Sequence, residues 1–442
     1  MTMLPPPLDE YGRVMLRSRG MRAATRLLAW LMVSGVALAS VACTPSGGGG
    51  SHGGASGAGG GAEGGSAGMG GSCDGSLGGA SAGELALPPL TGSHLIGVQR
   101  RTLTDTSREE EATSVSGDSR RITVKFWYPS DSCSTAPRAP YTTPTEAQYY
   151  QPVSMNGAPS GWQEGIHTNS RDAPALEPGA SRFPIVIMSH GFKNVREAYT
   201  SFAEQLASHG FVVAAISHAY DTEVTEFSEG DYATFAPAFG KLPPPNQTLD
   251  SHIEVWVQDA KFVLNELAKL HLNDEQGYFT GRLDLENVGI FGHSYGGATA
   301  ARACIEDARF DAGMNMDGTF FGPNRENGGE KVPKPFAIFV ASNHPPGDLT
   351  MKGTFSLSSP AYELTLADSG HGTFSEERFV FEHVFPSKTA DTTHFGTLEP
   401  GRALEVIEAY TVAFFEQYLA GKSSTLLDGP SADFPEVEVA SH

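Results

Sequence analysis

The feature that most constrains the fold is the pentapeptide GHSYG at 292–296, because of the segments on either side of it. The β-branched, apolar run at 288–292 is typical of a strand, and the alanine-rich segment at 296–306 has helical spacing. A chain that turns from strand to helix at one residue strains that residue's backbone, and small flanking residues let the neighbouring chain pass close. The pattern therefore predicts a tight turn that exposes the hydroxyl of Ser294 at a helix N-terminus.

The rest of residues 84–442 continues the alternation of short apolar runs with helical periodicity, which is typical of parallel-sheet units. We expect strands at 95–103, 121–129, 184–190, 211–217, 288–292, 312–316, 335–341 and 362–367, and helices at 197–208, 249–270, 296–306 and 401–420. The sequence thus predicts one α/β domain with a mostly parallel, doubly wound sheet and helices on both faces. Insertions are expected near 130–180 and near 221–249, the second a candidate lid or pocket wall.

A serine hydroxyl becomes a nucleophile when a histidine removes its proton and an acid orients that histidine. The histidines that follow Ser294 are His344, His371, His383, His394 and His442. His371 comes directly after the predicted strand at 362–367, where a side chain can reach back over the carboxyl edge of the sheet. We therefore predict His371 as the general base.

Two aspartates end predicted strands on the same edge and are candidates for the acid. Asp317 follows the run at 312–316 directly, whereas Asp348 lies in a loop of prolines and glycine. Asp368 is too close in sequence to His371 to lie easily behind its ring. We favour Asp317, because its position is better fixed, and Asp348 stays the alternative.

Backbone N–H groups are expected to bind the oxyanion of the reaction. One is the N–H of Tyr295, directly after the serine, and the second is that of Phe192, in a turn that follows a buried strand. His190 precedes Gly191 in that turn and is predicted to be structural. The remaining residues of the predicted nucleophile turn are Gly292, His293 and Gly296.

Four segments resemble the platelet-activating-factor acetylhydrolase family of α/β-hydrolases. They are GHSYGGAT at 292–299, IMSHGF at 187–192, MNMDGTFF at 314–321 and SGHGTF at 369–374, within a likeness that covers roughly residues 90–420. The resemblance implies the α/β-hydrolase fold, and it strengthens the choice of Asp317 because the family's acid follows the strand after the nucleophile helix. It also implies hydrolysis of carboxylic esters, with phospholipid acyl groups among the candidates. A Ser–His–Asp mechanism proceeds through an acyl-enzyme and is expected to need neither metal nor cofactor. Phe192, Tyr295, Phe320 and Phe321 are expected to make the pocket mouth apolar, which favours short or medium acyl groups.

The sequence departs from the family at Gly318-Thr319, which replace an aromatic partner after the acid, and in a shorter, glycine-rich histidine loop. Polyester or cutinase-like hydrolases and dienelactone hydrolases share the serine turn, so they stay alternatives. A catalytically inactive surface binding lipoprotein is a further alternative, and amide substrates would use the same groups.

The N-terminal 43 residues are predicted to be an export signal. Five arginines precede an apolar run at 27–39, which is too short to span a bilayer. The run ends in Ser40-Val41-Ala42-Cys43, which resembles a bacterial lipobox apart from Ser40, so Cys43 is a candidate for lipidation and ordinary cleavage is the alternative. Of the next 40 residues, 32 are Gly, Ser or Ala, which predicts a disordered tether over 44–83. The domain is therefore expected outside the cell, lipid-anchored or secreted.

Charge and cysteine content narrow the partners. Residues 84–442 hold 25 Lys and Arg against 47 Asp and Glu, and this excess of negative charge argues against nucleic-acid binding. No cysteine or histidine spacing indicates a metal site. Cys73 and Cys133 are a candidate disulfide pair, and Cys304 is expected to be a buried, free thiol. The sequence leaves the oligomeric state open.

Overall fold

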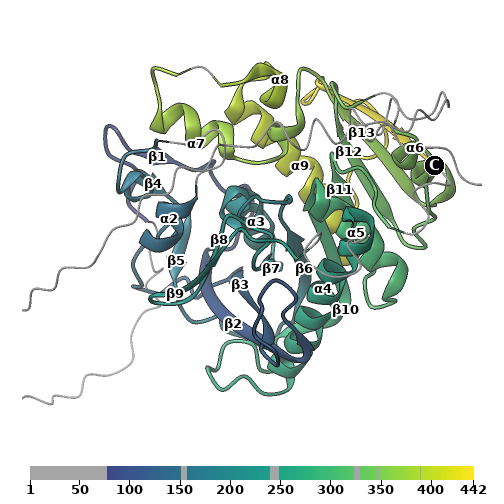
Figure 1. Cartoon of the computed structure of the whole chain (residues 1–442). Helices are drawn as coiled ribbons and strands as arrows, with labels where there is room; N and C mark the ends of the chain where they lie inside the picture. The colour runs from purple at the N-terminus through teal and green to yellow at the C-terminus, as the bar shows by residue number, and fades with distance from the viewer. Residues whose placement is uncertain (1–76, 151–156, 239–247, 323–328, 346–347, 389) are drawn as a thin grey trace, which may run out of the picture. The chain divides into compact units, whose positions relative to one another are not determined.

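The computed structural model describes residues 77–150, 157–238, 248–322, 329–345, 348–388 and 390–442. Their centre is a ten-stranded sheet with helices on both faces, as Figure 1 shows. Its strand order is β14 (Val437–Ser441), β13 (Ala361–Leu366), β12 (Phe336–Ala341), β11 (Ala312–Met316), β10 (Leu283–His293), β6 (Phe183–Ser189), β7 (Val212–Ser217), β3 (Ser119–Pro129), β2 (Ile96–Glu109) and β5 (Ser170–Asp172). The strands from β13 to β7 pair in parallel, and so do β2 and β5. The pairs β14–β13, β7–β3 and β3–β2 are antiparallel. The predicted mostly parallel sheet is thus confirmed.

The helices divide between the two faces of the sheet. The helical segments are α2 (Pro144–Tyr149), η1 (Trp162–Gly165), η2 (Arg196–Tyr199), α3 (Thr200–Ser208), α4 (Leu249–Leu272), α5 (Tyr295–Glu306), α6 (Leu349–Leu357), η4 (His371–Phe374), α7 (Glu377–Val384), α8 (Thr392–Phe395) and α9 (Pro400–Leu419). Side chains of α3 and α9 belong to one hydrophobic cluster, and side chains of α4 and α5 belong to another. The sheet is therefore covered on both sides.

Strand β6 explains why the central strands are continuously apolar. Ile185 and Ile187 belong to the cluster with α4 and α5, whereas Val186 and Met188 belong to the cluster with α3 and α9. Successive side chains of a strand point to opposite faces, so a strand buried on both faces has no polar alternation. All four residues are 0% exposed.

Parallel pairing brings the carboxyl ends of β6, β10, β11, β12 and β13 to one edge of the sheet. The register aligns Gly292 with Ser189 on one side and with Asn315 on the other. The turns that leave these strands carry the predicted oxyanion segment, Ser294, Asp317 and His371. The sheet topology thereby places residues from distant parts of the sequence next to each other.

Both insertions contain regular structure that the sequence did not predict. The stretch 221–249 contains the hairpin of β8 (Val224–Ser228) and β9 (Asp231–Thr234). The stretch 130–180 contributes α2, η1 and β5, and also β4 (Ile166–His167), which pairs with β1 (Leu85–Ala86). Strand β14 at the opposite sheet edge was also not predicted, because its run of five residues follows a loop rather than a helix.

Several predictions fall outside the described residues. These are the export signal at 1–43 with Cys43, most of the tether at 44–83, and residues 239–247 of the second insertion. Cys133 is disulfide-bonded and Cys304 is free and buried, but Cys73, the predicted partner of Cys133, lies in the undescribed part. Among the described residues, no helix combines the length and apolarity needed to cross a membrane.

Candidate active site

The backbone at Ser294 is strained in the way the sequence pattern predicts. Ser294 lies between β10 and α5 with φ 56° and ψ −119°, a backbone conformation that residues other than glycine rarely adopt. Its N–H donates to the carbonyl of Met316 over 2.8 Å, which ties the turn to β11. A Cβ at Gly296 would lie 2.1 Å from the carbonyl oxygen of Ser189, so only glycine fits there. Ser294 is partly exposed, although the residues on either side of it are buried.

Asp317 and His371 form a direct hydrogen-bonded pair. Asp317 follows β11 with φ 52°, and its Oδ2 lies 2.7 Å from Nδ1 of His371. Asp317 is 1% exposed, and its bonds to His344 and His371 outweigh burial and hold the pKa of its carboxyl well below its usual range. An ionised Asp317 accepts the Nδ1–H of His371, which leaves Nε2 of that ring as the basic nitrogen.

His293, next to the serine, connects the histidine loop to the oxyanion segment. Its Nε2 lies 2.9 Å from the carbonyl of His371, and its Nδ1 lies 2.8 Å from the hydroxyl of Tyr199. That hydroxyl also accepts the N–H of Gly191 over 3.2 Å. Burial holds the pKa of His293 well below its usual range, so the ring is neutral, donating to His371 and accepting from Tyr199.

The predicted oxyanion segment lies beside the serine. A Cβ built on Gly191 would lie 3.5 Å from Cβ of Ser294, so the turn after β6 passes directly over the nucleophile turn. The ring of Phe192 contacts those of Tyr295 and Trp256, at centroid distances of 5.7 and 6.4 Å. Tyr295 begins α5, where backbone N–H groups have no partner within the helix.

His344 and Asp348, each considered singly from the sequence, both join the Asp317 group. Nδ1 of His344 lies 2.9 Å from Oδ1 of Asp317, and its Nε2 lies 3.3 Å from Oδ2 of Asp348. Asp317 therefore lies between two histidines, and Asp348 bonds the second nitrogen of His344. Of the other candidates, Asp368 is exposed, His383 lies on α7 and His442 lies at the C-terminus against Phe355. His394 is closer, with its ring 6.2 Å from that of His371.

A second Ser–His–Asp chain, which the sequence did not reveal, lies behind the oxyanion segment. Oγ of Ser189 is 2.8 Å from Nε2 of His218, and Nδ1 of His218 is 2.9 Å from Oδ2 of Asp259. All three residues are 0% exposed. His218 also stacks on Trp256 at 3.9 Å, and its backbone N–H donates to the ring of His190. His190 is thus a structural residue in this packing, buried and bonded through Nδ1 to its neighbour's carbonyl.

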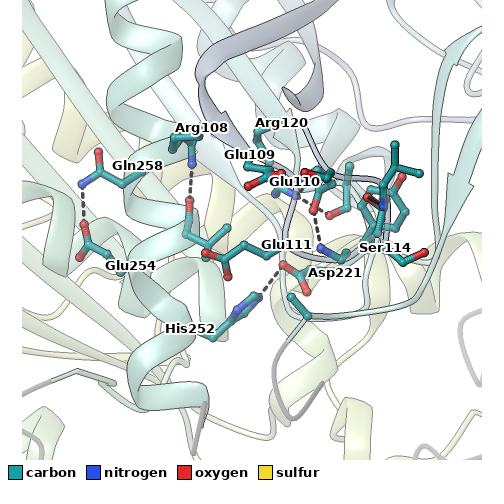
Figure 2. Close-up of a pocket in the computed structure, with 18 of the residues that line it drawn as sticks. Arg108, Glu109, Glu110, Glu111, Ser114, Arg120, Asp221, His252, Glu254 and Gln258 are labelled. Carbon is teal, nitrogen blue, oxygen red and sulfur yellow. Dashed lines mark hydrogen bonds and ion pairs between the residues drawn. The ribbon is translucent and has the colours of Figure 1, made fainter. Parts of the chain in front are cut away.

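A cavity of about 660 Å³ lies between the turn joining β2 to β3 and the first turns of α4 (Figure 2). Its charged lining residues are Arg108, Glu109, Glu110, Glu111, Arg120, Asp221 and Glu254. The proposed site does not open into this cavity, because Ser294, Asp317 and His371 do not line it. Oδ2 of Asp221 accepts from His252 and from Trp256, and the Trp256 ring contacts those of Phe192 and Tyr295.

Metal ligands do not gather anywhere in the part of the chain that the structure describes. No group of three or more His, Cys, Asp or Glu side chains there has the geometry to hold a metal ion. The histidines around Asp317 are instead bonded directly to carboxylate and carbonyl oxygens.

Comparison with known proteins places this geometry in a family. The family model of platelet-activating factor acetylhydrolase, isoform II, matches residues 79–230 and 263–426. A probable 1-alkyl-2-acetylglycerophosphocholine esterase of Arthroderma benhamiae is 28% identical over 380 residues, covering 79% of this chain and 92% of the relative. The platelet-activating factor acetylhydrolase of Cavia porcellus is 27% identical over 54% of this chain and 58% of its own length.

The solved structure of a ferulic acid esterase from Streptomyces cinnamoneus superposes with a TM-score of 0.68 at 27% identity. The superposition covers 81% of this chain and all of the ferulic acid esterase chain, and it confirms the α/β-hydrolase fold. The family model matches well over half of the chain. This chain therefore belongs to the platelet-activating factor acetylhydrolase, isoform II, family and is a carboxylic ester hydrolase.

Proposed function

We propose that the chain hydrolyses carboxylic esters through Ser294, His371 and Asp317. The observation that carries the proposal is the strained turn at Ser294 beside the hydrogen-bonded pair of His371 and Asp317. A hydroxyl presented at a helix N-terminus needs a base within reach, and the bond between His293 and the His371 carbonyl supports that placement.

In the proposed mechanism Ser294 Oγ attacks the acyl carbon while His371 Nε2 takes its proton. Asp317 keeps the imidazole in the required tautomer and stabilises its charged form. His371 then donates the proton to the leaving alcohol, and water attacks the acyl-enzyme with His371 again as the base. The N–H groups of Phe192 and Tyr295 bind the developing oxyanion, an effect of about 3–4 kcal/mol per donor.

The substrate is proposed to be an ester of a short or medium acyl group. An aromatic group lies next to Ser294 and consists of Phe192, Tyr295, Trp256 and Phe321. The ring centroids of Phe321 and Tyr295 are 5.1 Å apart. Such a group favours apolar acyl chains, and the relatives extend the candidates to acetylated glycerophosphocholines. The ferulic acid esterase neighbour adds feruloyl esters as a second candidate class, which the same aromatic rings would accommodate.

The experiment is an ester panel with wild-type protein and Ser294→Ala. The panel contains p-nitrophenyl esters of increasing acyl length, an acetylated glycerophosphocholine, methyl ferulate, a polyester film and an anilide. Ser294→Ala should lower turnover of p-nitrophenyl acetate by at least ~10³ in folded protein. Undiminished turnover would overturn the assignment, and an unreactive wild-type protein would instead favour the binding lipoprotein.

We further propose that the chain is exported and anchored through a lipid on Cys43. The proposal rests on the sequence alone, since Cys43 lies outside the described residues. In a bacterial host, wild-type protein should incorporate labelled palmitate and fractionate with membranes, and Cys43→Ala should do neither. Equal fractionation of the two proteins would contradict the anchor.

A further inference from the structure

His344 is held between two carboxylates, although a general base needs a ring nitrogen free to accept a proton. Its Nδ1 faces Oδ1 of Asp317 at 2.9 Å, and its Nε2 faces Oδ2 of Asp348 at 3.3 Å. The side chains of the three residues are 10%, 1% and 6% exposed, in that order. Little water therefore separates these charges.

Hydrogen-bond chemistry defines the form of His344 that fits this position. An ionised carboxylate only accepts hydrogen bonds, so both ring nitrogens of His344 must donate, and only the imidazolium carries two N–H groups. Burial alone would lower the pKa of His344, but its bonds to Asp317 and Asp348 raise that pKa to about 9. The bond with His344 in turn helps hold the pKa of Asp348 at about 2, despite burial.

The backbone fixes all three groups. After β12 the chain turns back, and the N–H of His344 donates to the carbonyl of Ala341 over 3.0 Å. The N–H of Ala341 donates to the same Oδ1 of Asp317 that His344 contacts, over 2.8 Å. Asp348 caps α6 by accepting the N–H and the hydroxyl of Thr350, at 2.9 and 2.6 Å. His344 thus links Asp317, at the end of β11, to Asp348, at the N-terminus of α6.

We propose that His344 is a positioning residue for the reaction: as an imidazolium anchored by Asp348, it holds Asp317 from the side opposite His371 and limits how strongly Asp317 draws a proton onto His371. This inference rests on the proposed function of Ser294, His371 and Asp317. Its consequence is that the charge of Asp317 is partly balanced from the side opposite His371, so the acidic limb of the pH–rate profile depends on His344.

The other groups that face His371 do not supply this charge. Its titratable neighbours are Asp317, His293 at a ring distance of 4.5 Å and His394 at 6.2 Å, with Asp391 beyond His394. Burial holds the pKa of His293 well below its usual range, and burial and the charge of His371 lower that of His394 to about 4. Near neutral pH both are uncharged, so His344 is the cation next to Asp317.

The test separates the charge of His344 from its hydrogen bond. In His344→Asn the side-chain amide can still donate to Asp317 from nearly the position of Nδ1, but the positive charge is lost. Without that charge His371 is protonated more easily, so the acidic limb of the kcat/KM profile for p-nitrophenyl acetate should move up by about 0.5–1 pH unit. His344→Ala, which loses the bond as well, should also lower the plateau kcat by roughly 10- to 100-fold.

The matched control is His383→Asn, on α7 and apart from the Asp317 group, which should leave both limb and plateau unchanged. A limb in His344→Asn that coincides with wild type would overturn the proposal. Activity that persists in Ser294→Ala would instead overturn the proposed function, so the two failures are distinguishable.

A readout independent of activity is the NMR titration of ¹⁵N-histidine-labelled protein, with the His344 signals assigned by their absence in His344→Asn. The proposal predicts that both ring nitrogens of His344 carry protons at pH 7. It also predicts that Asp348→Asn, which keeps a side chain able to cap α6, makes His344 lose its proton at lower pH. A neutral His344 ring at pH 7 in wild-type protein would contradict the proposal even if the limb moved.

Discussion

Ser294, His371 and Asp317 have a buried counterpart in the same molecule, because Ser189, His218 and Asp259 are the same three residue types and include the same aspartate–histidine hydrogen bond. In both groups an aspartate oxygen faces Nδ1 of the histidine, at 2.7 Å for Asp317 and 2.9 Å for Asp259. The two serines are also close, since Ser189 pairs with Gly292 in the sheet. Residue type and the aspartate–histidine bond therefore do not distinguish the two groups.

Backbone conformation and exposure do distinguish them. Ser189 is an ordinary, fully buried strand residue whose hydroxyl is used by His218, whereas Ser294 has φ 56° and is partly exposed. The aspartates differ as well, because Asp259 is paired with the guanidinium groups of Arg108 and Arg120. The comparison indicates that a strained, accessible serine at a strand end makes one group a candidate for chemistry. The buried group instead holds the turn that carries Phe192.

The largest expected effect separates the two aspartates by activity. Asp317→Asn should lower kcat for p-nitrophenyl acetate by about 10³–10⁴, because an amide does not hold the His371 tautomer or stabilise its charge. Thermal unfolding by circular dichroism checks that the variant is folded. A folded Asp317→Asn protein with kcat within tenfold of wild type would show that Asp317 is no more important for catalysis than Asp259.

Asp259→Asn should act mainly on stability. Arg120 is 4% exposed and bonds Asp259 over 2.7 Å, so loss of the carboxylate leaves a buried cation partly unpaired. We expect the free energy of unfolding in urea to fall by about 3–5 kcal/mol, with kcat of the folded fraction within about tenfold.

The control for this change is Asp231→Asn, which removes a carboxylate from the exposed pair with Arg121. Its expected cost is about 0–1 kcal/mol, because water screens the pair. Equal destabilisation by Asp259→Asn and Asp231→Asn would show that the burial of Asp259 has no energetic consequence.

Ser189→Ala is a smaller perturbation of the buried group. It removes the hydroxyl from His218 and leaves the Nε2 of a buried ring without that partner. The expected loss of unfolding free energy is about 1–3 kcal/mol. The second-order rate of labelling by a fluorophosphonate should change less than about tenfold. Complete loss of labelling would show that Ser189, and not Ser294, is the nucleophile.

The smallest expected effect tests the link that Tyr199 makes between the oxyanion segment and the histidine loop. Tyr199→Phe removes the hydroxyl that accepts from Gly191 and contacts His293, so kcat should fall about fivefold, equivalent to about 1 kcal/mol. Tyr410→Phe is the matched control, because its buried hydroxyl has no hydrogen-bond partner among the residues that the structure describes, so its loss should not lower kcat. Indistinguishable kinetics of the two variants would show that the Tyr199 link does not position His371.

Most of the sheet could be predicted from the sequence because each central strand is a continuous apolar run next to a helical segment. The predicted strand at 312–316 coincides with β11, and this agreement places Asp317 directly at a strand end. Strand β10 begins at Leu283, earlier than predicted, since its first residues include acids and asparagine in an irregular pairing with β6.

The contacts among polar residues could not be predicted in the same way. His344 reaches Asp317 only because the chain turns back after β12, and Asp348 reaches His344 only because it caps α6. His218 and Asp259 meet because α4 brings Asp259 next to the residue that directly follows β7. No periodicity reports such turns and crossings, so the sequence indicates which residues could take part but not which of them touch.

The most direct test of the central distinction is peptide mapping of wild-type protein after reaction with a fluorophosphonate. The reagent phosphonylates an activated serine hydroxyl, and both serines are present in one molecule, so each is the other's internal control. We predict stoichiometric modification of the peptide that contains Ser294, no modification of the peptide that contains Ser189, and no labelling of Ser294→Ala. Modification at any other serine, or an active enzyme whose Ser294 stays unmodified, would contradict the account.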